Sequence, residues 1–308
     1  YGGFIFGNWD NDAISLDSYL GDLRWYLDVL IERSLGGVEV IPGQQRYSVD
    51  GNWKIAAENF VGDSYHLAHS HGSAYGLPIR QINPINPMVF RNRKLEYYDI
   101  AMDGGHGFTQ FTLSGERAEV DQMLAAEMGP EIVEYVQECH ARLVKLSEAQ
   151  AKVYALPFGN IFPNFSINDF SALSPIGLYL WTPKGPGSLE VWQWAATDRD
   201  APQVIKDIAR VDFTRFQSTA GIVGPDDTEN FEQVTQSTSG VVGQRLDFNY
   251  QMTLEREFVE GFDDVPGYIS TYVSEENQRL FYKHWADLMD GGRGVRQAYD
   301  KPRLTAQG

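Results

Sequence analysis

Residues 177–197, GLYLWTPKGPGSLEVWQWAAT, are the stretch of sequence that best defines the fold. Two runs, Gly177–Thr182 and Leu189–Thr197, are rich in aromatic and β-branched residues. They flank the segment Pro183–Ser188, in which two prolines and two glycines are typical of a tight turn. This arrangement predicts two neighbouring strands joined by a hairpin, and hence an antiparallel sheet.

Other parts of the chain extend this pattern to an antiparallel sheet with helices packed on it. Apolar residues at helical spacing predict helices over residues 15–33, from about 53, within 117–152, from 202 to 216 and over 274–291. Strands therefore occur in runs, with helices between the runs, which indicates the α+β class rather than a doubly wound parallel sheet. The further predicted strands are Asn160–Ile167, Arg245–Leu254 and a hairpin formed by Val38–Ile41 and Arg46–Val49.

The composition excludes several classes of protein. The 308 residues carry a formal net charge of −17, which argues against nucleic acid or an anionic membrane as main partner, because both are bound by clustered Lys and Arg. No apolar run approaches the roughly 18–20 residues that span a bilayer, and no signal peptide is recognisable, so we expect a cytoplasmic location. The single cysteine, Cys139, excludes an internal disulfide and a cysteine-ligated cluster, and its apolar helical neighbours predict a core position.

Three of the six histidines, His66, His69 and His71, lie within six residues in the stretch ENFVGDSYHLAHSH (58–71). Imidazole is the commonest protein ligand of transition metals, so this cluster predicts a metal site. His66 and His71 are about 140° apart on an ideal helix, and both can bind one ion only if the helix ends between them. Asp63, three residues before His66, can meet the ring of that histidine and fix its tautomer.

The third ligand is open at this point, because the chain has 42 carboxylates. Asp226 and Asp227 are good candidates, although acids at the start of a helix also serve as caps. Two histidines and one carboxylate form the non-heme Fe(II) oxygenase arrangement, which leaves three coordination positions free. A zinc hydrolase could use the same ligand types, but the helical His-Glu-x-x-His signature does not occur in the sequence.

These motifs resemble the catalytic-domain signature of Rieske-type aromatic ring-hydroxylating dioxygenases, in particular the large (α) subunits of the naphthalene and phenanthrene type. The resemblance covers nearly the whole chain. The matching segments are Phe6–Gly7, Ser18–Gly21, Arg24–Leu27, Asn52–Lys54, Glu58–His66 with His71, Ile161–Asn164 and Asp226–Asn230.

The resemblance implies an α+β fold of the helix-grip type, similar to START and Bet v 1 domains. It implies a mononuclear Fe(II) held by His66, His71 and Asp227. It also implies that Asp63 links His66 to the Rieske cluster of a neighbouring subunit, and that Asn59 lies close to the iron.

The same resemblance implies the domain organisation and the partners. Residues 1–37 correspond to the end of the Rieske region and a connecting helix, and 38–308 to the catalytic domain. The start Tyr1–Trp9 reads as a strand already inside a fold, so we expect the chain to begin within a longer protein. The [2Fe–2S] cluster would lie in an upstream Rieske domain, because it needs two Cys/His pairs. The expected assembly is a homotrimer or an α3β3 complex with a small β subunit, and a ferredoxin is the expected electron donor.

The reaction implied is the addition of both atoms of O₂ to an aromatic hydrocarbon, giving a cis-dihydrodiol. The absence of Lys and Arg from the stretches near the motifs favours a neutral substrate, although Arg80 could reach in and reverse this inference. We expect His69 to line the pocket or the surface. The candidate pocket residues are Phe60, Leu67, Leu156, Phe158, Gln217 and Val223.

Several alternatives remain open from the sequence. A Rieske-type monooxygenase or demethylase, or a dioxygenase of aromatic acids, could use the same iron site. A non-catalytic carrier of hydrophobic ligands on a related fold would bind no iron. Reaction products and iron content separate these possibilities.

Overall fold

A computed structural model describes residues 1–75, 95–113, 129–254, 258–259, 262 and 264–291. Its centre is a nine-stranded sheet in the order β1-β8-β7-β6-β5-β4-β3-β9, with β2 also paired to β8. Every strand pair is antiparallel, which confirms the predicted class. The strands are β1 (Val38–Val40), β2 (Gln45–Val49), β3 (Leu95–Ala101), β4 (Gly107–Leu113), β5 (Val153–Ile161), β6 (Phe165–Asp169), β7 (Ile176–Gly185), β8 (Ser188–Asp198) and β9 (Tyr268–Thr271).

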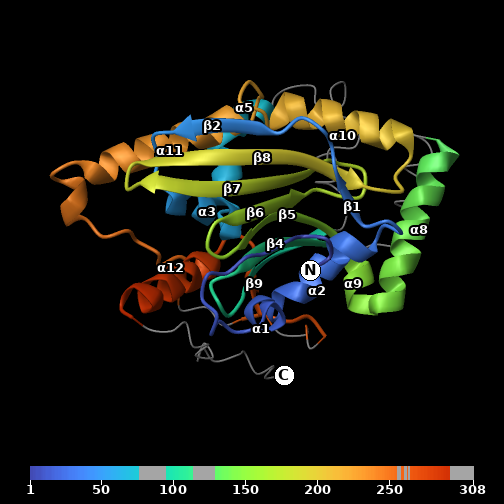
Figure 1. Cartoon of the computed structure of the whole chain (residues 1–308), viewed down its shortest axis with the longest axis horizontal. Helices are drawn as coiled ribbons and strands as arrows, with labels where there is room; N and C mark the ends of the chain where they lie inside the picture. Colours follow the sequence, from blue (N-terminus) through green and yellow to red (C-terminus); the bar gives the residue numbers. More distant parts are fainter. Residues whose placement is uncertain (76–94, 114–128, 255–257, 260–261, 263, 292–308) are drawn as a thin grey trace.

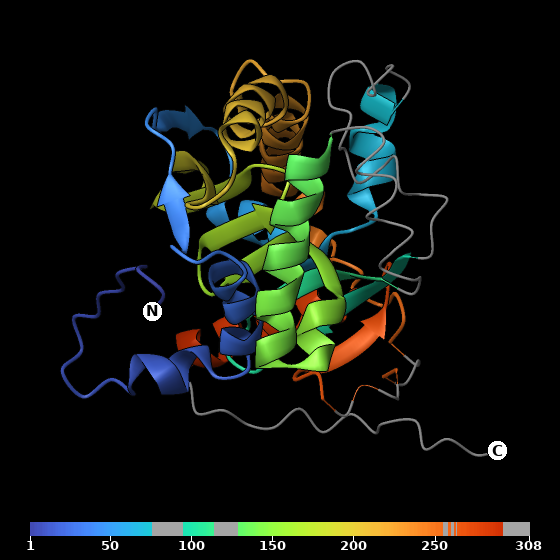
Figure 2. The same ribbon diagram turned by 90° about the vertical axis from the view of Figure 1, so that its right-hand side faces the viewer.

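Helices cover both faces of the sheet. The helices α3, α11 and α12 lie on one face, and α1 and α2 lie on the other (Figure 1). Figure 2 shows the N-terminal helices on one side and the α4–α5 segment on the opposite side. The helices are α1 (Leu16–Leu20), α2 (Leu23–Glu32), α3 (Trp53–Gly62), α4 (His66–Ser70), α5 (Gly72–Tyr75), α8 (Pro130–Leu146), α9 (Glu148–Lys152), α10 (Gln203–Phe216), α11 (Gly224–Ser239) and α12 (Glu276–Met289). No helix in the described part has both the length and the apolar character that crossing a bilayer requires.

The β7–β8 hairpin forms as predicted, and its alternation divides the hydrophobic core in two. Leu178 points to the face covered by α2, whereas Tyr179 and Trp181 point to the face covered by α3. Successive side chains of a strand face opposite sides, so one hairpin contributes to both cores. The aromatic core on the α3 side, which includes Phe60, supports the candidate site described below.

The predicted hairpin between residues 38–41 and 46–49 is wrong. β1 and β2 do not pair with each other; both pair with β8, at Val38↔Asp198 and at Val49↔Leu189. β8 spans 11 residues, so its edge accommodates both short strands one after the other. Pro42 lies between them and has no N–H to donate to the ladder, which interrupts the pairing.

Three other strand predictions need correction. Residues Tyr1–Trp9 form no strand; they contain turns and extended chain without a ladder partner among the described residues. The segment 160–167 contains a turn, because β5 ends at Ile161 and β6 begins at Phe165, with Pro163 between them favouring a turn. The segment 245–254 forms no strand in the described structure, and its first residue ends a short 3-10 helix, Gly243–Arg245. Its apolar side chains Leu246, Phe248, Met252 and Leu254 are exposed, so they do not form one face of a packed strand.

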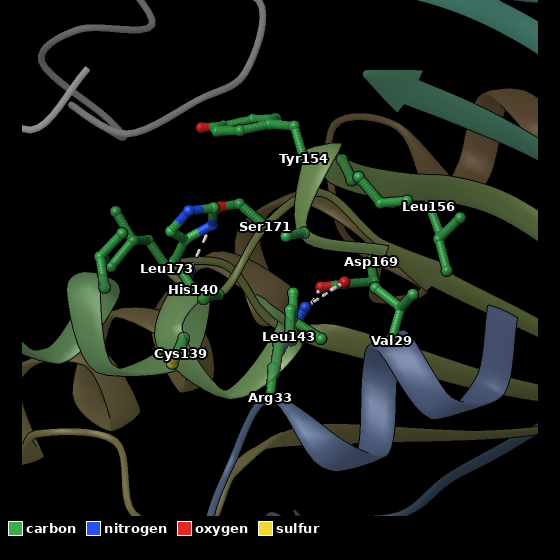
Figure 3. A pocket seen from close by; sticks show the side chains of 15 residues that line it. Val29, Arg33, Cys139, His140, Leu143, Tyr154, Leu156, Asp169, Ser171 and Leu173 are labelled. Atoms are coloured by element: carbon green, nitrogen blue, oxygen red, sulfur yellow. Dashed lines mark hydrogen bonds and ion pairs between the residues drawn. The ribbon is translucent and has the colours of Figure 1, made fainter. Parts of the chain in front are cut away.

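A buried ion-pair cluster holds the end of α2 against the sheet. Arg33 forms ion pairs with Asp169 of β6 and with Asp198 of β8, and its Nε lies 2.9 Å from Asp198 Oδ2. Tyr135 of α8 donates a hydrogen bond of 2.7 Å to Asp198. Arg33, Asp169 and Cys139 line a cavity of about 50 Å³. Figure 3 shows the three side chains around it. Cys139 is a buried free thiol, as predicted for a core position.

Candidate metal centre

The first histidine of the cluster is placed by a tight turn between α3 and α4. Asn52 accepts a hydrogen bond from the Lys54 N–H and so caps the start of α3. At the other end Asp63 has φ −78° and ψ 70°, the geometry of an inverse γ-turn. Asp63 Oδ1 then accepts a hydrogen bond of 3.2 Å from the backbone N–H of His66, where α4 begins. The turn thereby fixes the direction in which the His66 side chain leaves the backbone.

His71 lies just past the end of α4, as joint binding with His66 requires. The helix ends at Ser70, and His71 occupies its C-cap with φ −104° and ψ 14°. The change in backbone direction brings the two imidazole rings to a centroid distance of 5.1 Å. Both histidines are buried.

Asp227 reaches the two histidines from the first turn of α11. Its Oδ1 lies 3.1 Å from His71 Nε2 and 3.6 Å from His66 Nε2. One potential ligand atom from each of the three residues lies within 4.8 Å of the other two. Asp227 Oδ1 is buried, yet it takes part in no hydrogen bond of acceptable geometry. A buried carboxylate oxygen without a partner is costly, and a cation between the three side chains would satisfy it.

The other ring nitrogens face acceptors, which orients both rings. His66 Nδ1 contacts the backbone carbonyl of Asp63, and His71 Nδ1 lies 3.3 Å from Asp226 Oδ2. An N–H on each Nδ1 leaves each Nε2 lone pair directed toward Asp227. The Asp63 carboxylate is 3.7 Å from His66 Nδ1, so its backbone carbonyl, rather than the expected side chain, fixes the ring.

The donor set fits a divalent transition metal. Two neutral imidazole nitrogens and one carboxylate oxygen suit Fe(II), and three protein ligands leave coordination positions open. Without a metal, burial lowers the pKa of His66, but the carboxylates of Asp63 and Asp227 outweigh burial and raise it overall. A metal ion would compete with this proton, so metal affinity is expected to increase with pH.

The family comparison agrees with this geometry. Residues 16–291 match the family described as "Ring hydroxylating alpha subunit (catalytic domain)". The chain belongs to this family. The resemblance inferred from the sequence motifs is thereby confirmed.

Two relatives within the ring-hydroxylating family are named as dioxygenase subunits. The chain is 34% identical over 299 residues to the benzene 1,2-dioxygenase subunit alpha of Pseudomonas putida, covering 94% of this chain and 63% of that protein. It is 33% identical over 302 residues to the biphenyl 2,3-dioxygenase subunit alpha of Rhodococcus jostii (strain RHA1), covering 94% and 61%. The chain therefore spans less than two thirds of the length of these relatives.

A solved structure shows the same fold. The crystal structure of naphthalene 1,2-dioxygenase from Rhodococcus sp. bound to indole superposes with a TM-score of 0.71 at 29% identity. The match covers 94% of this chain and 65% of that chain. The expected fold of the catalytic domain is thus confirmed.

Three of the six predicted pocket residues lie on the face of the ring-hydroxylating domain that carries the metal centre. Phe60 of α3 and Phe158 of β5 have ring centroids 6.3 Å apart, and Phe158 is 5.9 Å from the ring of His66. Leu67 packs against the same aromatic core. Asn59, predicted to lie near the iron, is buried on α3, one residue before Phe60.

The other three pocket candidates have different surroundings. Leu156 packs in the core on the α2 side, because a register shift in β5 between residues 156 and 159 turns it away from Phe158. Gln217 accepts a hydrogen bond of 3.1 Å from the hydroxyl of Tyr179, which lies in the aromatic core. Val223 is the N-cap residue of α11, the helix that carries Asp227.

Two sequence expectations concern residues outside the ligand set. His69 is exposed and does not belong to the group of converging donor atoms. Arg80 lies outside the described residues, so its reach stays untested. The sequence analysis did not identify Tyr179 and Trp181, which pack in the same aromatic core as Phe60 and Phe158. Because both side chains lie on one face of the predicted β7–β8 hairpin, their alternation could have indicated this shared position.

A half-buried acid lies on the helix that leads into the site. Glu58 of α3 accepts hydrogen bonds from the hydroxyls of Tyr282, at 2.5 Å, and Tyr250, at 3.0 Å. Burial raises the pKa of Glu58 to about 7; the two tyrosines oppose this shift, and the charges of Asp63 and Glu275 add to it.

We expect Glu58→Gln to reduce the pH dependence of folding stability. The pKa of Glu58 is raised on folding, so the native protein binds this proton more tightly than the unfolded chain, and stability falls as pH rises from about 4.5 to about 7. Glutamine resembles the neutral, protonated form of the side chain and removes this loss, which is about 3 kcal/mol. Urea unfolding at pH 5 and pH 8 measures the effect. A variant with the same pH dependence as the wild type would contradict the prediction.

Proposed function

We propose that this chain is the catalytic domain of a terminal oxygenase component that adds both atoms of O₂ to an aromatic hydrocarbon and gives a cis-dihydrodiol. The observation that carries the proposal is the convergence of His66, His71 and Asp227 beside an aromatic wall. Its relatives, named benzene and biphenyl dioxygenase subunits, support this class of substrate.

The metal ligands proposed are His66, His71 and Asp227. When bound there, Fe(II) would supply the open coordination positions at which O₂ is activated by transferred electrons. The backbone carbonyl of Asp63 and the carboxylate of Asp226 hold the two imidazoles in the tautomer that can bind the ion.

The apolar side chains beside the ligands give the site its selectivity. Phe60, Leu67 and Phe158 present rings and methyl groups that exclude water and favour a flat hydrocarbon. Gln217, held by the hydroxyl of Tyr179, places a polar amide near this wall. We propose that these residues orient the substrate ring, with Val223 near the edge of the same site, while Leu156 acts from the core behind it.

Electrons are proposed to arrive through Asp63 from a Rieske [2Fe–2S] cluster. Asp63 is partly exposed at the turn between α3 and α4, and its backbone contacts His66 directly. The cluster would belong to a Rieske domain of the longer protein, fed by a ferredoxin. In this scheme residues 1–37 connect that domain to the catalytic residues 38–308. The cytoplasmic location stays a prediction.

An exposed apolar segment supports an oligomeric assembly. The segment 241–254 follows α11, and Tyr250 on it bonds to Glu58 of α3, the helix that leads to Asp63. A homotrimer, or an α3β3 complex, would cover this apolar segment and bring a neighbouring subunit close to Asp63. The exposed side chains are Val241, Val242, Leu246, Phe248, Met252 and Leu254.

We expect the double variant Leu246→Asp/Phe248→Asp to weaken self-association. Leu246 is 70% exposed and Phe248 56% exposed, so aspartates there add charge without disturbing the core. Sedimentation velocity over a range of concentrations measures the change in mass. The matched control places aspartate at Val204, which is exposed on α10 away from the segment. An unchanged mass in the double variant would exclude this surface as the interface.

Product analysis tests the proposed reaction. The full-length protein with a ferredoxin, a reductase and NADH should convert benzene, biphenyl or naphthalene to a cis-dihydrodiol that carries two labelled atoms from ¹⁸O₂. One labelled atom, in a phenol or a dealkylated product, would indicate a monooxygenase instead. Tight binding of the hydrocarbons without any bound iron would indicate a carrier.

A further inference from the structure

Asp99 is a fully buried carboxylate that lies behind the turn carrying Asp63 and His66. It belongs to β3, next to Ile100, which packs in the core on the α2 side, so the Asp99 side chain faces the α3 side of the sheet. Oδ1 accepts a hydrogen bond of 2.8 Å from Thr109 Oγ1 of β4. Oδ2 accepts hydrogen bonds from Ser64 Oγ at 3.2 Å and from the backbone N–H of Ser274 at 3.1 Å. One side chain thus joins the sheet, the metal-ligand turn and the segment before α12.

Ser64 connects Asp99 to the turn that carries Asp63 and His66, and its own backbone is constrained by that turn. It is buried between Asp63 and the ligand His66, and its backbone N–H bonds to the Gly62 carbonyl at 2.9 Å. The Ser64 carbonyl accepts a longer hydrogen bond, 3.4 Å, from the hydroxyl of Tyr272. The turn is therefore held by two hydrogen bonds of Ser64, one to Asp99 of β3 and one from Tyr272, which directly follows β9.

The hydrogen bond from the Ser274 N–H to Asp99 lies next to a residue with an unusual backbone conformation. Val273, which precedes Ser274, has φ 67°, a left-handed conformation that is costly for a β-branched residue. Such strain persists only where the surroundings determine the backbone geometry. Asp99 provides this constraint directly through Ser274, and Ser270 adds a hydroxyl contact of 2.8 Å to Ser274.

We propose that Asp99 is a positioning residue of the metal centre: through Ser64 it fixes the turn that presents Asp63 and His66. The inference rests on the proposed function of His66 as a metal ligand. Burial raises the pKa of Asp99 to about 7, and the hydrogen bonds from Thr109, Ser64 and Ser274 oppose this shift. Of these contacts, only the one from Ser64 reaches the turn that carries Asp63 and His66.

Two hydroxyl deletions separate positioning from general stability. Ser64→Ala removes the link from Asp99 to the turn, whereas Thr109→Val removes the link from Asp99 to the sheet and serves as the matched control. Both delete one buried donor to the same carboxylate, so both are expected to lower Tm. Only Ser64→Ala should weaken metal binding, by about tenfold or more, as for other residues that orient metal ligands.

The probe is Co(II), titrated into the metal-free protein and followed by its visible d–d absorption. Support requires a weaker Kd and a changed spectrum in Ser64→Ala, with Thr109→Val within about threefold of wild type. Asp99→Asn, if it folds, should lose at least as much affinity as Ser64→Ala. Equal affinities in Ser64→Ala and wild type, or equal losses in the two hydroxyl variants, would overturn the proposal. Wild-type protein that binds no Co(II) at His66 would instead overturn the metal centre itself, and the positioning role with it.

Discussion

Alanine at His66, His71 or Asp227 is expected to abolish iron binding and, with it, the proposed oxygenation. Each residue supplies one of three donor atoms that lie within 4.8 Å of one another. Residues that only orient ligands contribute about 10–100-fold to metal affinity, and direct ligands should contribute more. Iron content measured on the purified protein should fall from about one atom per chain to less than about a tenth of that value.

Two neighbouring residues provide the controls for the ligand variants. His69→Ala should keep its iron, because His69 is exposed and outside the converging group although it belongs to the same sequence cluster. Asp226→Asn should retain iron with an affinity about tenfold lower, since Asp226 contacts only the Nδ1 side of His71. Unchanged iron content in all three ligand variants would refute the assignment of these residues as the iron ligands.

Arg33→Met is expected to cause the largest loss of folding stability. The side chain of Arg33 is 5% exposed, and those of Asp169 and Asp198 are 2% and 0% exposed. The variant therefore leaves two carboxylates buried without a cation; the ion pair between Arg33 and Asp169 is shown in Figure 3. Breaking a buried pair by removing one partner costs about 3–5 kcal/mol. Urea unfolding at pH 7 measures the loss.

The matched control is Arg46→Met, at an ion pair on the surface. Arg46 contacts Glu190 at 2.7 Å but is 56% exposed, and such pairs contribute about 0–1 kcal/mol. Acid should partly rescue Arg33→Met: without the guanidinium, the two aspartates take up protons more readily in the folded state, so stability rises as pH falls. Equal losses in the two arginine variants, or no rescue by acid, would show that Arg33 does not act through the buried charges.

Local sequence patterns predicted the elements that depend on near neighbours. The β7–β8 hairpin follows from two strand-like runs around a Pro/Gly turn, and α3 and α10 follow from helical spacing. The partner of a strand depends on distant residues instead. The short strands β1 and β2 each have the sequence pattern of one strand of a hairpin. In the structure both form hydrogen bonds to the long strand β8 instead of to each other.

The same distinction applies to the metal centre. The sequence by itself determined His66 and His71 as candidate ligands, because a cluster of histidines is a local feature, and the family resemblance added Asp227. The helix end that joint binding requires was a condition from the spacing, and the structure places it at Ser70. Only the tertiary structure decided the rest: that Asp226 orients His71, that the backbone of Asp63 holds His66, and that Asp99 anchors the turn from another strand. The Asp226–His71 and Asp99–Ser64 contacts join segments that are distant in the chain, and hydrogen bonds between such segments leave no periodic signal in a single sequence. The Asp63–His66 contact is local, but it depends on the backbone angles of the turn between α3 and α4.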